Sequence, residues 1–233
     1  MKIKRMLASI ISAAVISLSS VTICESNIAY ADFSSNPVIS RECPAYSSSG
    51  MAASANDKYY YSFWNSNGAD YLAYIMAVEE LAKVCATTAT IVAAHATLGV
   101  FPIYQFGTPE QKKKYLPDLL SGRKLGAFAL TEPGAGTDSS MQQTTAVLDG
   151  DEYVLNGTKV FITNAGYADI YVVIAMTDKS KGNKGISAFI VEKGWEGFSF
   201  GSHEKKMGIR GSSTCELIFE NVKVPKENLL GEV

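Results

Sequence analysis

A glycine-rich loop holds the residues of this sequence that are best suited to binding chemistry. Residues 130–138 read Leu-Thr-Glu-Pro-Gly-Ala-Gly-Thr-Asp and include Gly134 and Gly136. Glycines let a backbone come close to a phosphate, to which N–H groups and hydroxyls can then donate hydrogen bonds. A dinucleotide fingerprint needs G-x-G-x-x-G at the start of a helix, and a P-loop needs Gly-Lys-Ser/Thr; neither pattern is present. On spacing alone, a Pro-Gly turn without a ligand is the alternative interpretation.

Other residue types give no metal, redox or nucleic-acid signal. The cysteines are far apart and form no CxxC pair, so neither a zinc site nor a redox dithiol is expected; they are Cys24, Cys43, Cys85 and Cys215. His95 lies in an apolar run with no second His or Cys at ligand spacing, which favours a hydrogen-bonded core residue. A formal charge of -2 gives no basic footprint for sequence-independent nucleic-acid binding.

The first residues have the pattern of a secretory signal peptide. Lys2, Lys4 and Arg5 precede an apolar run that ends at Cys24, and a small-x-small site follows at 29–31. This pattern predicts a signal peptide over residues 1–31. A short membrane anchor or an interfacial helix is the alternative, although the run barely reaches the ~20 apolar residues that a spanning helix needs.

Residues 32–69 form a Ser- and Tyr-rich segment of different composition. The stretch NPVISRECPAYSSSGMAASANDKYYYSFW resembles the start of a discoidin-like (factor V/VIII type C) carbohydrate-binding domain. Its aromatic residues could stack on sugar faces or lie in a core; they are Tyr59, Tyr60, Tyr61 and Trp64. A secreted carbohydrate-binding module is therefore an alternative function.

Three helices are expected between residues 70 and 124. Apolar residues at three- and four-residue intervals predict an amphipathic helix over Tyr71–Val84. Residues 87–106 are apolar on nearly all sides, which predicts a helix buried among other helices. A third helix should start at Thr108-Pro109, because proline suits the first helical position, and should end at Ser121-Gly122. Its three lysines, 112–114, are expected on a solvated face.

Beyond Lys124 the pattern changes to strands. The expected strands are Gly126–Thr131, Gln143–Leu148, Tyr153–Asn156, Lys159–Thr163, Ile170–Met176, Ile186–Val191 and Thr214–Phe219. Asp149-Gly150 and Asn156-Gly157 are hairpin dipeptides. No helix pattern alternates with these strands, so we expect an antiparallel, closed or sandwiched sheet. The predicted fold class is α+β, with a partial helical domain over 70–124 followed by an antiparallel β-barrel-like domain over 125–233.

Five segments of the chain point together to one family. They read YIMAVEELAKVCATT, GTPEQKKKYLPDLLSG, AFALTEPGAGTDSSMQQTTA, YVLNGTKVFITNAGYAD and KGISAFIVEKGWEGFSFGSHEKKMGIRGSSTCELIFENVKVPKENLLGE. Over about residues 70–232 the chain resembles the acyl-CoA dehydrogenase family, and within it the short-chain or butyryl-CoA dehydrogenases. The resemblance implies FAD bound between two helical domains and a middle β domain. It also implies oxidation of an acyl-CoA to the trans-2-enoyl-CoA, electron-transferring flavoprotein as acceptor, and a homo-oligomer.

The resemblance also implies roles for residues of the first strand and the glycine-rich loop. Phe128, Leu130 and Thr131 match the strand end that lies along the flavin ring, with Thr131 hydrogen-bonded to the polar edge of the ring. Gly136 belongs to the cofactor-binding loop. Thr137 matches a hydroxyl residue that contacts the FAD pyrophosphate and the pantetheine arm of the substrate.

A second flavin-binding segment is implied at residues 161–163. Phe161 matches an aromatic residue that packs against the flavin, Ile162 follows it, and Thr163 would bond near flavin N5. A flavin needs a flat apolar wall together with a few donors, which fits these residue types. Glu132 is acidic and nearby, but a base must reach the substrate proton geometrically, so it is not assigned as the catalytic base.

The family's catalytic glutamate belongs to a C-terminal helical domain, and no residue of this chain aligns with it. The sequence therefore predicts a fragment without dehydrogenase activity of its own. A folded but non-catalytic flavin or acyl-CoA binder is a further alternative. Localisation stays open, because a signal peptide indicates export whereas acyl-CoA and FAD chemistry is intracellular.

Overall fold

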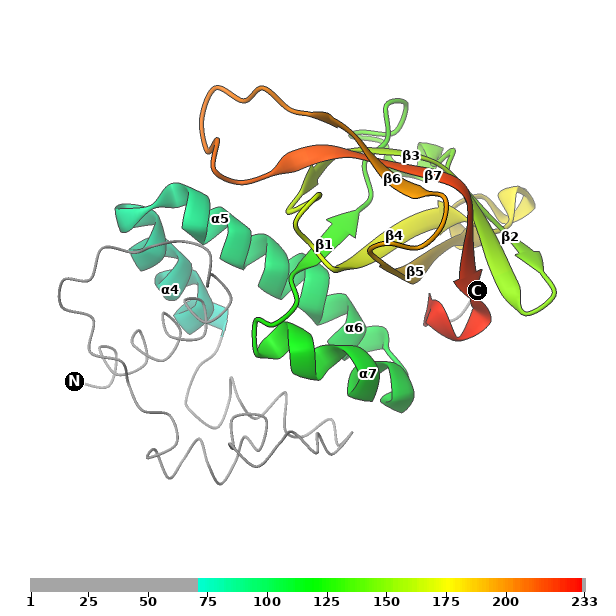
Figure 1. Ribbon diagram of the computed structural model, residues 1–233, viewed down its shortest axis with the longest axis horizontal. Coiled ribbons are helices and arrows are strands. Elements are labelled where there is room, and N and C mark those ends of the chain that lie inside the picture. Colours follow the sequence, from blue (N-terminus) through cyan, green and yellow to red (C-terminus); the bar gives the residue numbers. More distant parts are fainter. Residues whose placement is uncertain (1–70, 232–233) are drawn as a thin grey trace. The chain divides into compact units, whose positions relative to one another are not determined.

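A computed structural model of the protein describes residues 71–231 (Figure 1). The signal peptide expected over 1–31 and the segment 32–69, with its aromatic residues, lie outside the described residues. The described chain divides into two compact units. One contains residues up to 92 and residues 109–124; the other contains residues 93–108 and residues from 125 onward.

The first unit is helical and largely follows the expected pattern. Helix α4 spans Tyr71–Val84, as predicted, and α7 spans Pro109–Leu120, with its proline at the expected first position. The chain then leaves the helix at Gly122, which has a φ of 72°. The lysine face was predicted only in part, because Lys112 is buried while its two lysine neighbours are exposed.

The apolar stretch 87–106 forms three consecutive helical segments. Helix α5 spans Ala86–Ala94, the π-helical segment η3 spans His95–Val100, and α6 spans Phe101–Phe106. Burial on all sides was the wrong expectation for these residues, since large apolar side chains are exposed, namely Leu98, Phe101 and Phe106. By length and composition alone residues 86–106 could also cross a membrane, a property that core helices of soluble proteins share.

Within the second unit, η3 packs directly on strand β1 (Gly126–Ala129). The two backbones approach so closely that a Cβ added at Gly99 would lie 2.7 Å from the Cα of Gly126. His95 Nδ1 accepts a hydrogen bond of 2.9 Å from the Gly126 N–H. His95 is thus a hydrogen-bonded packing residue, as its sequence context predicted.

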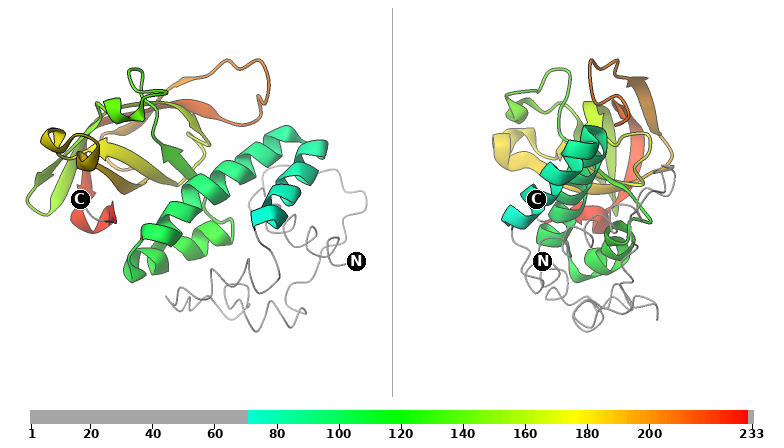
Figure 2. Two further views of the ribbon diagram at one scale, coloured as in Figure 1. Left: turned by 180° about the vertical axis from the view of Figure 1, so that it is seen from behind. Right: turned by 90° about the vertical axis from the view of Figure 1, so that its left-hand side faces the viewer.

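The second unit contains one open, mixed sheet of eight strands (Figure 2). After β1 come β2 (Thr145–Asp149), β3 (Glu152–Thr163), β4 (Ile170–Met176), β5 (Ile186–Glu192), β6 (Phe198–His203), β7 (Thr214–Pro225) and β8 (Leu229–Leu230). Their order is β6-β7-β3-β2-β4-β5-β8, and β1 pairs with β4.

A helical part followed by a β domain was correctly predicted, but the closed, wholly antiparallel sheet was not. Strands β1 and β2 both run parallel to β4, whereas the other pairs are antiparallel. The β2–β3 hairpin lies between β1 and β4 in the chain, which allows these two strands to run in the same direction. The sheet ends at β6 and β8, which do not pair with each other.

One of the two expected hairpins is present. Asp149 pairs with Glu152 across the β2–β3 turn, which confirms the Asp149-Gly150 hairpin. Asn156-Gly157 instead lies inside β3, so two predicted strands are one strand of 12 residues. The ladder to β7 shifts register there, and Asn156 and Asn221 exchange hydrogen bonds of 2.8 and 3.1 Å. A β-bulge therefore takes the place of a turn.

Aromatic and aliphatic side chains from β3 to β7 fill the core of the β domain. The rings of Phe198 and Phe219 stack with centroids 5.0 Å apart, and Tyr171 meets Phe198 edge-on at 4.9 Å. Leu155 and Leu217 are fully buried among them. Burying one such side chain stabilises the fold by about 1.5–3 kcal/mol. This core fixes β3, and β3 carries the second predicted flavin-binding segment.

Candidate functional site

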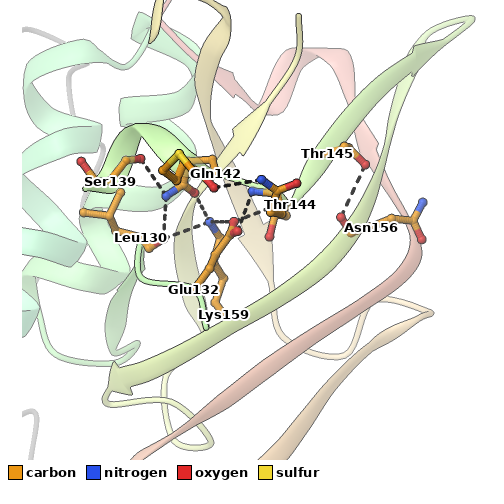
Figure 3. Close-up of polar contacts among 10 residues, drawn as sticks. Leu130, Glu132, Ser139, Gln142, Thr144, Thr145, Asn156 and Lys159 are labelled. Atoms are coloured by element: carbon orange, nitrogen blue, oxygen red, sulfur yellow. Dashed lines mark hydrogen bonds and ion pairs between the residues drawn. The ribbon is translucent and has the colours of Figure 1, made fainter. Parts of the chain in front are cut away.

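The loop that follows β1 lies over a buried ion pair. The Nζ of Lys159, on β3, is 2.7 Å from Oε1 of Glu132, and both side chains are almost completely buried (Figure 3). Lys159 Nζ also donates to the Leu130 carbonyl at 3.0 Å and to Oε1 of Gln142. The ammonium therefore uses all three of its donors on protein acceptors.

Gln142, at the other end of the loop, belongs to the same hydrogen-bond network. Its Nε2 donates to the carbonyls of Leu130, at 3.2 Å, and Ser139, at 3.0 Å (Figure 3). Its Oε1 accepts from Lys159. One buried amide thus links the start and the end of the loop to the lysine beneath it.

Glu132 is held as an anion by several donors. Its carboxylate accepts from the backbone N–H groups of Gln143, at 2.6 Å, and Thr144, at 3.0 Å, as well as from Lys159. Burial alone would raise the pKa of Glu132, but these hydrogen bonds outweigh it and lower the pKa. Burial lowers the pKa of the Lys159 ammonium, and its pairing with Glu132 opposes that effect. Both oxygens of Glu132 are occupied, so this carboxylate supports the loop and is not a free base.

The tip of the loop is a tight turn with open space above its glycines. Glu132 and Ala135 exchange backbone hydrogen bonds of 3.2 and 3.1 Å around Pro133-Gly134. A Cβ added at Gly134 or Gly136 would meet no atom within 4 Å. Packing among the described residues does not demand glycine at either position, and the open face is one that a bound group can approach closely. The turn expected from Pro-Gly chemistry is present, and its geometry leaves room for a ligand.

Phe161 combines a strained backbone with an exposed ring. It lies where the β3–β7 ladder shifts register between Lys159 and Ile162, and its φ is 60°. A side chain in this left-handed region costs about 1–2 kcal/mol, and such strain is concentrated at functional sites. The residue is 61% exposed. The fold therefore holds an aromatic face outward at an energetic cost.

The structure brings the two predicted flavin-binding segments together. The Val160 N–H donates to the Thr131 carbonyl at 2.8 Å, which places Thr131 beside the Phe161 bulge. Thr163 ends the same strand and is half-buried, whereas the Ile162 side chain points into the core and leaves only its backbone available.

The remaining predicted residues lie on β1 and along the loop. Phe128 and Leu130 are half-buried, and Gly136 and Thr137 are exposed.

Sequence reasoning missed Lys159 and Gln142. A signal for the lysine was present, because Tyr153 and Leu155 alternate inward along β3 and the same alternation carries Lys159 inward. For Gln142 there was no comparable signal, since it lies in a polar stretch between two strands.

Two domain families match the chain. "Acyl-CoA dehydrogenase, N-terminal domain" matches residues 64–123, and "Acyl-CoA dehydrogenase, middle domain" matches residues 127–222. Neither match extends into residues 32–63, so the discoidin-like resemblance gains no support from them.

Curated relatives and solved structures agree with these matches. The chain is 61% identical over 165 residues to the short-chain-specific acyl-CoA dehydrogenase of Clostridium acetobutylicum, covering 71% of this chain and 44% of that protein. It is 59% identical to butyryl-CoA dehydrogenase from Megasphaera elsdenii, with a TM-score of 0.70 over 72% of this chain and 44% of that one.

A second similar structure contains the flavin. It is acyl-CoA dehydrogenase from Bacillus anthracis complexed with FAD, which is 48% identical, with a TM-score of 0.65 over 71% of this chain and 28% of that one. The chain thus spans less than half the length of each of these three relatives.

Proposed function

Because the chain belongs to the acyl-CoA dehydrogenase family through its N-terminal and middle domains, we propose that residues 128–163 form one wall of an FAD site. The observation that carries this proposal is the exposed Phe161 ring, held at a φ of 60° beside Thr131. Two other features fit the group: the open face above Gly134 and Gly136, and hydroxyl donors nearby. FAD, when bound, supplies a two-electron acceptor for hydride.

In this proposal the residues divide the work of binding. Phe161 provides a flat apolar surface, while the hydroxyls of Thr131 and Thr163 donate to the polar edge of the flavin. Gly134, Gly136 and Thr137 present backbone and hydroxyl donors to the pyrophosphate. The geometry of the loop supports this division, since its glycine face is open and its far side is fixed to the buried lysine.

For the whole protein we propose α,β-dehydrogenation of a short-chain acyl-CoA. Relatives at 61% and 60% identity are named as short-chain-specific acyl-CoA dehydrogenases, which supports this substrate class. Electron-transferring flavoprotein is the proposed electron acceptor, and Thr137 is the proposed contact for the pantetheine arm. Glu132 does not serve as the base that removes the substrate proton, because its carboxylate is buried and already bonded.

Titration of FAD against the full 233-residue chain tests the cofactor site. We expect saturable quenching of flavin fluorescence, and about fivefold weaker binding for Thr131→Ala and for Thr163→Ala, the loss of about one hydrogen bond each. Ser199→Ala, on the exposed side of β6, is the control and should bind like the parent. Absence of binding to the parent chain would contradict the proposal.

A further inference from the structure

Two buried side chains hold the Leu130 carbonyl oxygen inside the β domain. Lys159 Nζ donates to it at 3.0 Å and Gln142 Nε2 at 3.2 Å. Lys159 is 0% exposed and Gln142 is 2% exposed, so both donors are shielded from water. A carbonyl bonded twice in this way has its direction fixed.

The direction of this carbonyl also sets the direction of the next N–H group. The peptide after Leu130 is trans, and in a trans peptide the C=O and the following N–H point in opposite directions. The Thr131 N–H is therefore directed away from Lys159, and no acceptor for it is found among residues 71–231. On its other side, the Thr131 carbonyl is fixed by the Val160 N–H at 2.8 Å. Both peptide groups of Thr131 are thus locked from within the protein.

The lysine is itself anchored by the rest of the cluster. Its bond to Glu132 fixes Nζ, and Glu132 in turn binds the N–H groups of Gln143 and Thr144. The segment just after β1, the segment just before β2 and the middle of β3 are linked at this single ammonium. Oriented donors of this kind bind a ligand without reorganising at the moment of binding.

We propose that Lys159 and Gln142 are positioning residues of the FAD site: by holding the Leu130 carbonyl inward, they present the Thr131 N–H to a flavin acceptor atom. This role rests on the function proposed above. Neither residue touches the flavin. The ligand group that the Thr131 N–H suits is a hydrogen-bond acceptor, such as a ring nitrogen or carbonyl oxygen of the isoalloxazine.

A matched pair of variants separates this role from simple support of the fold. Glu132→Gln removes the ion pair but keeps the Lys159 donor at the Leu130 carbonyl. The double variant Glu132→Gln/Lys159→Met additionally removes the lysine, with its donor to the Leu130 carbonyl and its donor to Gln142. It leaves no buried charge in the cluster, whereas Glu132→Gln keeps the ammonium without its anion. Both are made in the full chain and checked for cooperative unfolding before FAD is added.

We expect the double variant to bind FAD about tenfold more weakly than Glu132→Gln, the loss of one well-oriented hydrogen bond. In the parent and in Glu132→Gln the ¹⁵N–¹H resonance of Thr131 should move on addition of FAD. In the double variant this resonance should not move when FAD is added. A lysine with a merely structural role would leave this response intact in the folded protein.

The outcomes distinguish the two proposals. If the parent chain binds no FAD, the proposed function fails and the positioning role fails with it. If the parent binds and the double variant matches Glu132→Gln in affinity and in the Thr131 response, the positioning role alone is overturned.

Discussion

The β domain contains two buried regions that are built in opposite ways. Around Tyr171, Phe198 and Phe219 the core is aromatic and aliphatic, and its contacts have no strict direction. Around Lys159 and Glu132 the buried groups are charged and polar, and each contact is a directed hydrogen bond. Strand β3 crosses both regions.

The difference shows what each kind of burial contributes. Apolar cores tolerate volume-conserving substitutions, and they supply most of the free energy of folding. A buried ion pair adds little net stability, yet removing one partner is costly because the other charge is left unpaired. The polar cluster therefore contributes fixed geometry to the loop, while the aromatic core contributes stability.

The largest expected effect comes from breaking the polar cluster on one side. Lys159→Met leaves the Glu132 carboxylate buried without its cation and should lower the free energy of unfolding by about 3–5 kcal/mol. Leu217→Ala, in the apolar core, should cost about 2–5 kcal/mol through the cavity it creates. Urea denaturation measures both values.

The two variants should differ in FAD affinity, which fluorescence titration of the folded fraction measures. We expect Leu217→Ala to bind FAD as tightly as the parent does. Lys159→Met should bind FAD more weakly than the parent. If both variants lost the same amount of FAD affinity, the apolar core would matter for the geometry of the site as much as the polar cluster does, and the comparison would fail.

An intermediate effect is expected at Phe161, where stability and binding should respond separately. Phe161→Ala and Phe161→Gly both remove the ring, so both should weaken FAD binding. Only glycine relieves the backbone strain at a φ of 60°, so the Gly variant should be more stable than the Ala variant by about 1 kcal/mol. Thermal unfolding compares the two; an Ala variant as stable as the Gly variant would contradict the strain.

The smallest effect concerns pH. The folded-state pKa of Glu132 lies below the ordinary value of 4.5. The ionised Glu132 carboxylate therefore contributes fully to stability when the pH is above 4.5. We expect the contribution to be lost as the pH falls through the lowered pKa. Unfolding midpoints measured from neutral pH down to about pH 3 should therefore fall more steeply for the parent than for Glu132→Gln/Lys159→Met. Parallel curves would mean that Glu132 is not held as an anion.

Local signals were enough to predict the helices of the first unit. The periodicity of residues 71–84 and the proline at 109 depend only on neighbouring residues, and both boundaries agree with the structure. The parallel partner of β1 could not be found in this way, because strand pairing depends on segments far apart in the chain. Asn156-Gly157 is a hairpin dipeptide by composition, but Asn221 on β7 completes a bulge there instead.

The candidate site shows the same limit. Residue types and family motifs located its two segments. Burial of the Lys159 charge depends on Glu132 and Gln142, which lie 27 and 17 residues away and reach it only in the folded sheet. The left-handed backbone of Phe161 has no sequence signal, since phenylalanine rarely adopts it.

The contact between Gly99 and Gly126 has a consequence for how the chain can be divided. Residues 93–108 belong with the β domain, and residues 109–124 belong with the helical unit. The two units are therefore interleaved along the chain, not consecutive. A piece that begins at Leu125 would lose the helical wall of β1 and the His95 acceptor of the Gly126 N–H. Neither unit can be excised intact by a single cut, and a recombination between them would have to exchange two segments at once.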